Sequence, residues 1–374
     1  MSQPNTPNFE SFSLLCKQIA QQKHQRLDPA KPIWIFGAGQ FGRDVCGVLK
    51  SNGFNVQGFV ETTPKSSQTL GLPVLSWRQL ESQQLTSQLV VGIFNRAMPL
   101  DELAGIAKSA GFSTIFMPWH VYTQFEQQLG WRFWLSSPDV ILDNLPSIER
   151  AYRNLADEKS KQCFLDICTF RLGQLNPYAS FVHAENQYFN DLTLSPLAGK
   201  KISFVDGGAY NGDTFLELTE KSEVSDAYLF EPDLENFKAL TTAVKTSGVP
   251  ALCLPLAVSD RYSILSFNAG NGEGGSISEH GTSHIAAVSL DEVLAGRQVD
   301  FIKLDVEGAE IPALKGAKDL IKRSRPILAI SLYHRPQDIW EISELLTQIC
   351  TGYNFYIRQH YFNSFDSVLY AIPD

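Results

Sequence analysis

The sequence predicts an α/β protein built from two Rossmann-like domains that are joined by helices. Short apolar runs typical of buried strands alternate with helical segments over residues 31–125 and again from residue 201 to the end. In both regions the first strand leads through a glycine-rich turn into a helix, as in nucleotide-binding folds. The length of 374 residues also fits two or three ordinary domains.

The N-terminal part is expected to contain a helix within residues 1–30 and a Rossmann-like nucleotide or nucleotide-sugar binding domain over residues 31–125. The helix is indicated by the amphipathic pattern of residues 9–26. The domain's expected strands are IWIF, VQGFVE, LVVGIF and TIFMP, with a helix in FGRDVCGVLKSNG after the first strand.

Residues 126–195 are predicted to form a helical connector, because IERAYRNLADEKSKQCFLDICTFRLGQL has helical character and no strand signal of comparable strength. Residues 196–374 are expected to form a second, larger α/β domain with a seven-stranded, mostly parallel sheet. Its strand candidates are ISFVDGG, AYLFEP, LCLPLAVS, FIKLDV, ILAISLY, NFYIRQ and SVLYAIP. The segment GNGEGGSISEHG has the composition of a flexible loop, which we expect to close over a substrate.

The composition argues against nucleic acid and membranes as binding partners. Hydrophobic residues make up 44% and charged residues 19% of the chain, as in folded proteins, and the formal charge of −9 offers no basic field for nucleic acid. No apolar run approaches the roughly 20 residues of a membrane span, and the polar N-terminus does not resemble a signal peptide. We therefore expect a cytoplasmic protein that binds neither nucleic acid nor membrane.

The segment ISFVDGGAYNGDTFLEL places an acid, glycines and a helix start directly after a buried strand. Glycines there allow the backbone to approach a ligand, and the first turn of the helix presents amide groups to an anion. About 20 residues later Glu231 ends the next strand, where an acid can accept both hydroxyls of a ribose. Order and spacing together favour a nucleoside site over an ordinary turn with two surface carboxylates.

The C-terminal half resembles the FkbM family of methyltransferases in FIKLDVEGAEIPALKGA, FVDGGAYNGDT and LFEPDLENF, over roughly residues 185–374. The resemblance implies a class I methyltransferase fold for residues 196–374. It also implies S-adenosylmethionine (SAM) as cofactor and O-methylation of a sugar or polyketide hydroxyl. It also implies that Lys303 and Glu310 belong to the family's fourth-strand signature. The string LCLPLAVSD departs from the family at Leu256, where a polar residue is expected, so the adenine contact is the least secure part of the assignment.

The resemblance and the loop pattern together assign the cofactor site. The expected cofactor-binding residues are Asp206, Gly207, Gly208, Tyr210, Asn211, Gly212, Asp213, Thr214, Glu231, Ala257, Val258 and Asp260. Tyr210 could lay its ring beside the sulfonium, since a cation over an aromatic face is attracted to it, although simple packing explains this residue equally well.

The predicted catalytic residues are Asp305, Glu307 and His334. Asp305 follows one strand and His334 the next, at the edge where α/β sheets bind ligands. A sugar hydroxyl needs a nearby proton acceptor, and a histidine that ionises near neutrality suits that task. No metal is assigned, but these three residues with Glu310 could instead bind a divalent ion that acidifies the hydroxyl.

A second glycine motif, GAGQFG, lies in the N-terminal domain at Gly37, Gly39 and Gly42, and Glu61 follows the second strand. It predicts a second nucleotide site, for a nucleotide or nucleotide-sugar, with a degenerate scaffold as the next interpretation.

The sequence therefore predicts a SAM-dependent O-methyltransferase acting on a small-molecule or carbohydrate acceptor, which the N-terminal domain could present in nucleotide-linked form. Two alternatives stay open: an NAD-dependent oxidoreductase that uses the N-terminal motif, and a non-catalytic nucleotide-sugar-binding protein. The sequence does not decide whether the chain forms a homo-oligomer.

Overall fold

The computed structural model describes residues 8–175, 182–268, 276–277, 281 and 283–374, which form two compact units. The N-terminal unit contains residues 1–148, 162–183 and 361–365, and the C-terminal unit contains 149–161, 184–360 and 366–374. The segment 126–195 is thus divided between the two units. No helix in the described part of the chain has the length and apolar character needed to cross a membrane.

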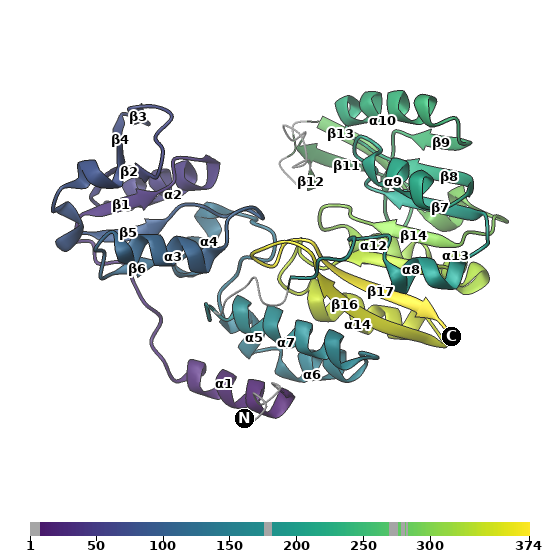
Figure 1. The fold of residues 1–374 in the computed structure, drawn as a ribbon, viewed down its shortest axis with the longest axis horizontal. Coiled ribbons are helices and arrows are strands. Elements are labelled where there is room, and N and C mark those ends of the chain that lie inside the picture. The colour runs from purple at the N-terminus through teal and green to yellow at the C-terminus, as the bar shows by residue number, and fades with distance from the viewer. Residues whose placement is uncertain (1–7, 176–181, 269–275, 278–280, 282) are drawn as a thin grey trace. The chain divides into compact units, whose positions relative to one another are not determined.

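The N-terminal unit contains a six-stranded sheet, parallel except for one short edge strand (Figure 1). Its order is β3 (Gln68–Thr69), β4 (Leu72–Ser76), β2 (Val56–Glu61), β1 (Ile33–Phe36), β5 (Gln88–Val91) and β6 (Ile115–Phe116). Its helices include α1 (Phe9–Ala20), α2 (Gln40–Ser51), α3 (Leu100–Ser109) and α4 (Pro118–Leu129). The four strands expected from the sequence are present, and β3 and β4 extend the sheet beyond β2.

The chain between the last strand of the first sheet and the first strand of the seven-stranded sheet contains helices, as its sequence pattern indicates. It contains α5 (Asp139–Leu142), α6 (Leu145–Arg153) and α7 (Glu158–Arg171). Within the N-terminal unit, the buried guanidinium of Arg171 donates a 2.8 Å hydrogen bond to the hydroxyl of Ser364. This bond ties α7 to residues 361–365, which are the part of that unit most distant in sequence.

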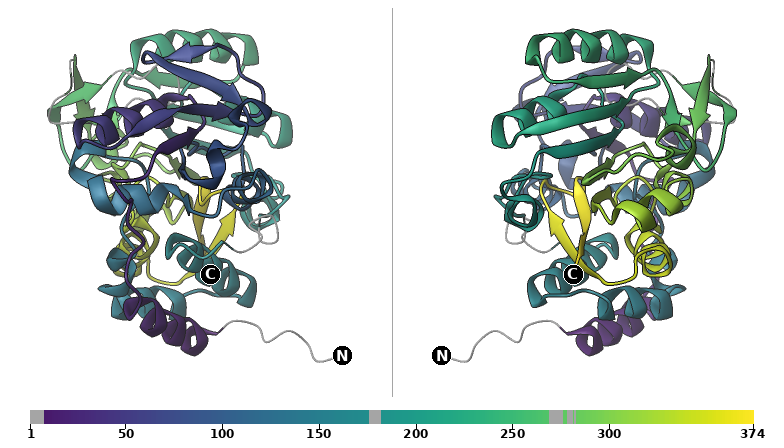
Figure 2. Two further views of the ribbon diagram at one scale, coloured as in Figure 1. Left: turned by 90° about the vertical axis from the view of Figure 1, so that its left-hand side faces the viewer. Right: turned by 90° about the vertical axis from the view of Figure 1, so that its right-hand side faces the viewer.

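The C-terminal unit has the predicted seven-stranded sheet, and each of the seven strand candidates contributes all or part of its length to it (Figures 1 and 2). The order is β16 (Tyr353–Gln359), β17 (Ser367–Pro373), β15 (Ile327–Ser331), β14 (Phe301–Leu304), β7 (Ile202–Gly207), β8 (Val224–Phe230) and β9 (Ala251–Leu254). Only β17 is antiparallel to its neighbours, β15 and β16. The predicted α/β fold with a mostly parallel sheet is confirmed.

The helices of this unit are α8 (Asp191–Leu194), α9 (Asp213–Lys221), α10 (Leu234–Ser247), α11 (Leu290–Val293), α12 (Glu310–Lys315), α13 (Lys318–Ser324) and α14 (Asp338–Ile349). Side chains on one face of the sheet, such as Phe204, Leu229 and Phe301, form a buried cluster with Phe215 of α9 and Leu240 of α10. Burial on this face fixes the strand register, because a shift of one residue would turn these side chains away from the core.

A separate four-stranded sheet was not expected. It consists of β10 (Ala257–Val258), β13 (Ser283–Val288), β11 (Ser263–Asn268) and β12 (Ser276–Ile277). The segment LCLPLAVS was predicted as one strand, but it divides between β9 and β10 at Pro255, which has no N–H to continue the ladder. Most of the predicted flexible loop GNGEGGSISEHG lies outside the described residues, apart from β12 and Gly281.

Parallel strands end at a common edge, so the residues that follow β8, β7, β14 and β15 are neighbours although they are far apart in sequence. The register of β7 and β14 places Lys303 opposite Asp206. This edge carries most of the residues that the sequence singled out as a site.

The first glycine motif offers a matched test of packing within α2. A Cβ at Gly42 would lie 2.1 Å from the carbonyl oxygen of Gly37, whereas a Cβ at Gly47 would meet nothing within 4 Å. We expect Gly42→Ala to destabilise the N-terminal unit by about 1–3 kcal/mol, a loss of roughly 2–10 °C in unfolding midpoint. Gly47→Ala should instead be neutral or stabilising by up to about 1 kcal/mol. Differential scanning calorimetry of both variants measures the contrast, and equal midpoints would contradict it.

Candidate functional site

The backbone of the glycine loop after β7 has positive φ angles at several positions, a conformation that favours glycine. Gly208 and Gly212 have φ of +82° and +87°, and Tyr210 adopts +47° between them. A Cβ at Gly208 would lie 1.9 Å from the carbonyl oxygen of Asp305, so the loop touches the end of β14 directly. Gly212 is the N-cap of α9, and the loop therefore presents the start of that helix at the sheet edge.

Lys303 of β14 holds this loop through an ion pair and a hydrogen bond. It is 3% exposed, its Nζ lies 2.8 Å from Oδ1 of the fully buried Asp206, and it donates a 2.7 Å hydrogen bond to the Gly208 carbonyl. Burial raises the pKa of Asp206 to about 6, against the opposing charge of Lys303. Burial alone would lower the pKa of Lys303, but Asp206 and Asp305 outweigh it and raise that pKa. Each buried group is thus stabilised in its charged form by the opposite charge of the other.

Glu231, directly after β8, reaches back to the glycine loop. Its Oε2 accepts the Tyr210 N–H at 2.9 Å, and its Oε1 accepts the Asp233 N–H at 2.8 Å. Burial raises the pKa of Glu231 to about 7, although both hydrogen bonds favour the ionised form. The structure thus brings Glu231 beside the loop, as the spacing predicts.

The other predicted cofactor residues lie in the glycine loop, at the start of α9 and in or just after β10. Gly207 ends β7, and the first turn of α9 is capped locally, since the Asp213 N–H donates to Asn211 and the Thr214 N–H to Asp213. Beyond the end of β9, Ala257 and Val258 are buried in β10 and Asp260 is exposed.

Asp305 directly follows β14, and its two oxygens accept from two phenols. Tyr333 donates to Oδ1 at 3.1 Å and Tyr188 to Oδ2 at 3.0 Å. Burial alone would raise the pKa of Asp305, but Lys303 and His334 lower it. The side chain keeps 22% of its surface exposed, so this carboxylate remains accessible.

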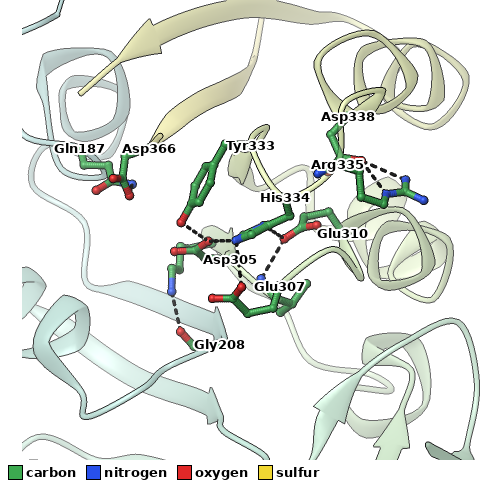
Figure 3. Close-up of polar contacts among 12 residues, drawn as sticks. Gln187, Gly208, Asp305, Glu307, Glu310, Tyr333, His334, Arg335, Asp338 and Asp366 are labelled. Atoms are coloured by element: carbon green, nitrogen blue, oxygen red, sulfur yellow. Dashed lines mark hydrogen bonds and ion pairs between the residues drawn. The ribbon is translucent and has the colours of Figure 1, made fainter. Parts of the chain in front are cut away.

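His334 lies fully buried among three carboxylates (Figure 3). Its Nδ1 is 2.8 Å from Oε1 of Glu310, and its Nε2 is 3.4 Å from Asp305 and 3.6 Å from Glu307. Burial favours the neutral ring, but the carboxylates outweigh it and raise the pKa of His334 to about 10. A ring that holds its proton at neutral pH cannot accept another, which does not fit the neutral base expected from the sequence.

A strained turn brings Glu307 back toward His334. Glu307 and Gly308 have φ of +53° and +93°, and the left-handed conformation at a residue with a Cβ costs about 1–2 kcal/mol. The turn is closed by Glu310, whose Oε1 also accepts the Val306 N–H at 2.9 Å. Such strain is typical of functional sites.

The same cluster offers ligands for a cation. Asp305, Glu310 and His334 each have one ligand atom within 4.8 Å of the others, and two of the three residues are buried. Carboxylate oxygens and an imidazole nitrogen suit divalent ions such as Mn²⁺ or Zn²⁺.

The partners of these residues were not predicted from the sequence. Tyr188 comes from the segment before α8, where no motif marked it, and the burial of Lys303 could be recognised only from its pairing with Asp206. Tyr333 could have been proposed as a site residue from the sequence, because it directly precedes His334 after β15.

The N-terminal glycine loop repeats the arrangement of the C-terminal one. Gly37 has φ of +102°, and the Ala38 N–H donates to Oε1 of Glu61 at 3.1 Å. Gly39 is the N-cap of α2, where an added Cβ would meet nothing within 4 Å, and Gly42 packs against Gly37. Gly42 of α2 and Glu61 of β2 thus both contact the loop that contains Gly37 and Gly39.

Comparison with known proteins supports the interpretation of the C-terminal unit. Residues 206–367 match the model of the methyltransferase FkbM domain. No curated protein matches the chain. The crystal structure of methyltransferase FkbM from Methylobacillus flagellatus KT is similar in fold, with a TM-score of 0.74 and 20% identity over 97% of this chain and 98% of that one.

Two further solved structures resemble about half of the chain more weakly. An rRNA methylase from Streptococcus thermophilus aligns with a TM-score of 0.33 and 12% identity, over 48% of this chain and 91% of its own. Trm1 from Pyrococcus horikoshii, solved with S-adenosyl-L-methionine, aligns with a TM-score of 0.30 and 14% identity, over 52% and 58%.

The matched segment begins at Asp206 and ends at Ser367, so it contains the glycine loop, Glu231, and the cluster around Asp305. The family model and the confirmed fold together identify residues 206–367 of this chain as a methyltransferase FkbM domain.

Proposed function

We propose that this methyltransferase uses SAM to methylate a hydroxyl group of a sugar or related natural product. The observation that carries the proposal is the position of two groups on one sheet edge. The glycine loop with Glu231 follows β7 and β8, and Asp305 follows the adjacent β14. A cofactor held by the loop would therefore have a carboxylate next to it.

The charges beside the glycine loop support SAM as the cofactor. Oδ2 of Asp206 is buried and has no hydrogen-bond partner among the described residues, so it can accept one from the cofactor's ammonium group. Glu231 would accept the ribose hydroxyls, Tyr210 would lie near the sulfonium, and the residues from Ala257 to Asp260 would border the adenine. When bound, SAM supplies an activated methyl group.

Methyl transfer to oxygen requires the acceptor oxygen in line with the methyl carbon and the departing sulfur. The C–S bond breaks as the C–O bond forms, and the hydroxyl proton must leave. The residues that the chain offers for this proton are Asp305 and Glu307, whose carboxylates are partly exposed. Asp305 is a weak base, but it suffices because the proton becomes strongly acidic as the oxygen gains the methyl group.

His334 has a supporting part in this scheme. Its ring lies between Asp305, Glu307 and Glu310, so it holds these carboxylates in place. A metal-assisted version is the second candidate, favoured by the ligand spacing of Asp305, Glu310 and His334. A bound ion would acidify the acceptor hydroxyl and take over part of the work of Asp305.

The charge of the cluster supports a hydroxyl acceptor without phosphate at the reacting end. Three carboxylates face one imidazolium there, which leaves an excess of negative charge that would repel a phosphate. In a nucleotide-linked sugar the diphosphate would have to lie away from Asp305.

The N-terminal loop supports a further nucleotide site, because Glu61 contacts Ala38 as Glu231 contacts Tyr210. We propose that this loop binds a nucleotide or nucleotide-sugar. Calorimetry separates the open alternatives: a nicotinamide dinucleotide that binds alone indicates an oxidoreductase, and a nucleotide-sugar that binds without methyl transfer indicates a binding protein.

The pKa of Glu231 gives the cofactor assignment a pH signature. If the ionised carboxylate accepts the ribose hydroxyls, SAM affinity should rise as pH increases through about 7, by about tenfold between pH 6 and 8. Glu231→Gln should weaken binding and lose that rise. Isothermal titration calorimetry measures both, and Glu235→Gln, an exposed change on α10, is the control. Unchanged affinity in both Glu231→Gln and Asp206→Ala would exclude this cofactor site.

The two glycine motifs should be separable by substitution. Gly39→Val places a side chain where the structure leaves space, on a loop that belongs to the N-terminal unit. We expect it to leave SAM affinity unchanged and to weaken nucleotide or nucleotide-sugar binding. Calorimetry with each ligand tests this, and a large loss of SAM affinity would instead indicate one composite site.

Substitutions in the acidic cluster should reduce turnover more than cofactor binding. We expect Asp305→Asn to lower kcat by roughly 10²–10⁴-fold while SAM affinity changes little, because Asp305 serves the acceptor proton. A radiolabelled methyl donor with acceptor extracts measures transfer, and Asp319→Asn, an exposed change on α13, is the control.

Chelation separates the two chemical versions of the mechanism. Enzyme treated with EDTA should keep its activity if Asp305 takes the proton directly, because no ion is then needed. Loss of activity that Mn²⁺ or Mg²⁺ restores would overturn that version in favour of the metal-assisted one.

A further inference from the structure

We propose that Tyr188 and Tyr333 are positioning residues that hold the Asp305 carboxylate for methyl transfer, an inference that rests on the proposed function. The two phenols reach Asp305 from different parts of the chain. Tyr333 follows β15, and Tyr188 precedes α8, 117 residues before Asp305 in the sequence. Each donates to a different oxygen, at 3.1 Å to Oδ1 and at 3.0 Å to Oδ2.

The Tyr188 phenol has a defined direction. Gln187 Nε2 donates to its oxygen at 3.0 Å, so the phenol hydrogen is left to point at Asp305. The backbone at this residue is also fixed, because its N–H donates to Asn186 Oδ1 at 3.1 Å and its carbonyl accepts from Thr193 Oγ1 at 2.8 Å. The ring is buried and lies 5.4 Å from the Lys303 ammonium.

Each phenol donates its single hydrogen to the Asp305 carboxylate. Their proposed role therefore runs through Asp305, which makes Tyr188 and Tyr333 positioning residues instead of acids or bases.

The arrangement limits how Asp305 can meet an acceptor. A carboxylate offers about four lone-pair positions. In the described part of the chain, Oδ1 accepts from Tyr333 and lies 3.4 Å from Nε2 of His334 (Figure 3). Oδ2 accepts from Tyr188. The phenols prevent the carboxylate from rotating away from this orientation.

A mutant cycle tests the inference. Tyr188→Phe and Tyr333→Phe each remove one hydroxyl and keep the ring, and we expect each to lower kcat roughly tenfold, the effect of losing one hydrogen bond to a charged group. SAM affinity should change less than about twofold. In an Asp305→Asn background neither substitution should lower kcat further, because the tyrosines act through that carboxylate.

Tyr353→Phe is the matched control, since its phenol donates a bond of 3.0 Å to the Pro326 carbonyl at the opposite end of β15. It should leave kcat unchanged, and circular dichroism confirms that each variant is folded. The inference would be overturned if Tyr188→Phe or Tyr333→Phe lowered kcat further in the Asp305→Asn background. It would also be overturned if Tyr353→Phe lowered kcat equally. If the wild type transfers methyl groups and Asp305→Asn retains normal kcat, the inference fails while the proposed function stands.

Urea unfolding tests the contact between Tyr188 and Asp305 without any methyl acceptor. The unfolding free energies of Tyr188→Phe and Asp305→Asn should be non-additive in the double variant, because the two residues share one bond. Additive values would contradict the contact itself. Absence of SAM binding by the wild type would instead exclude the proposed function.

Discussion

The edge of the C-terminal sheet depends on one buried ammonium group, that of Lys303. It pairs with Asp206, bonds the Gly208 carbonyl and lies beside the ring of Tyr188. These contacts join the cofactor loop to the part of the edge that carries Asp305. A buried charge that loses its partner costs about 3–5 kcal/mol, so neither member of the Lys303 and Asp206 pair can be exchanged alone without loss.

A second constraint is the balance of charge around His334. One imidazolium neutralises only part of the charge of three carboxylates, and the backbone accepts strain at Glu307 to bring its carboxylate close. The carboxylates are thereby held in fixed positions around the ring. Electrostatic preorganisation of this kind contributes to catalysis because the groups do not need to reorient during the reaction.

The two units use the same local chemistry at their glycine loops. In each, an acid at the end of the second strand accepts an N–H from the turn after the first strand. This contact requires a left-handed backbone at Gly37 in one loop and at Gly208 in the other. The acidic cluster, in contrast, belongs to the C-terminal unit alone, which is why the methyltransferase chemistry is assigned there.

The sequence by itself determined the α/β fold, all seven strands of the C-terminal sheet, and the clustering of Asp206, Glu231 and Asp305, since periodicity and the parallel strand order place strand ends together. It could not indicate that Pro255 would divide a strand between two sheets. Tertiary structure alone decided the partners of the site, such as Tyr188 on Asp305. It also decided the direction in which the pKa of His334 shifts, because a pKa depends on burial and on charges brought close by folding.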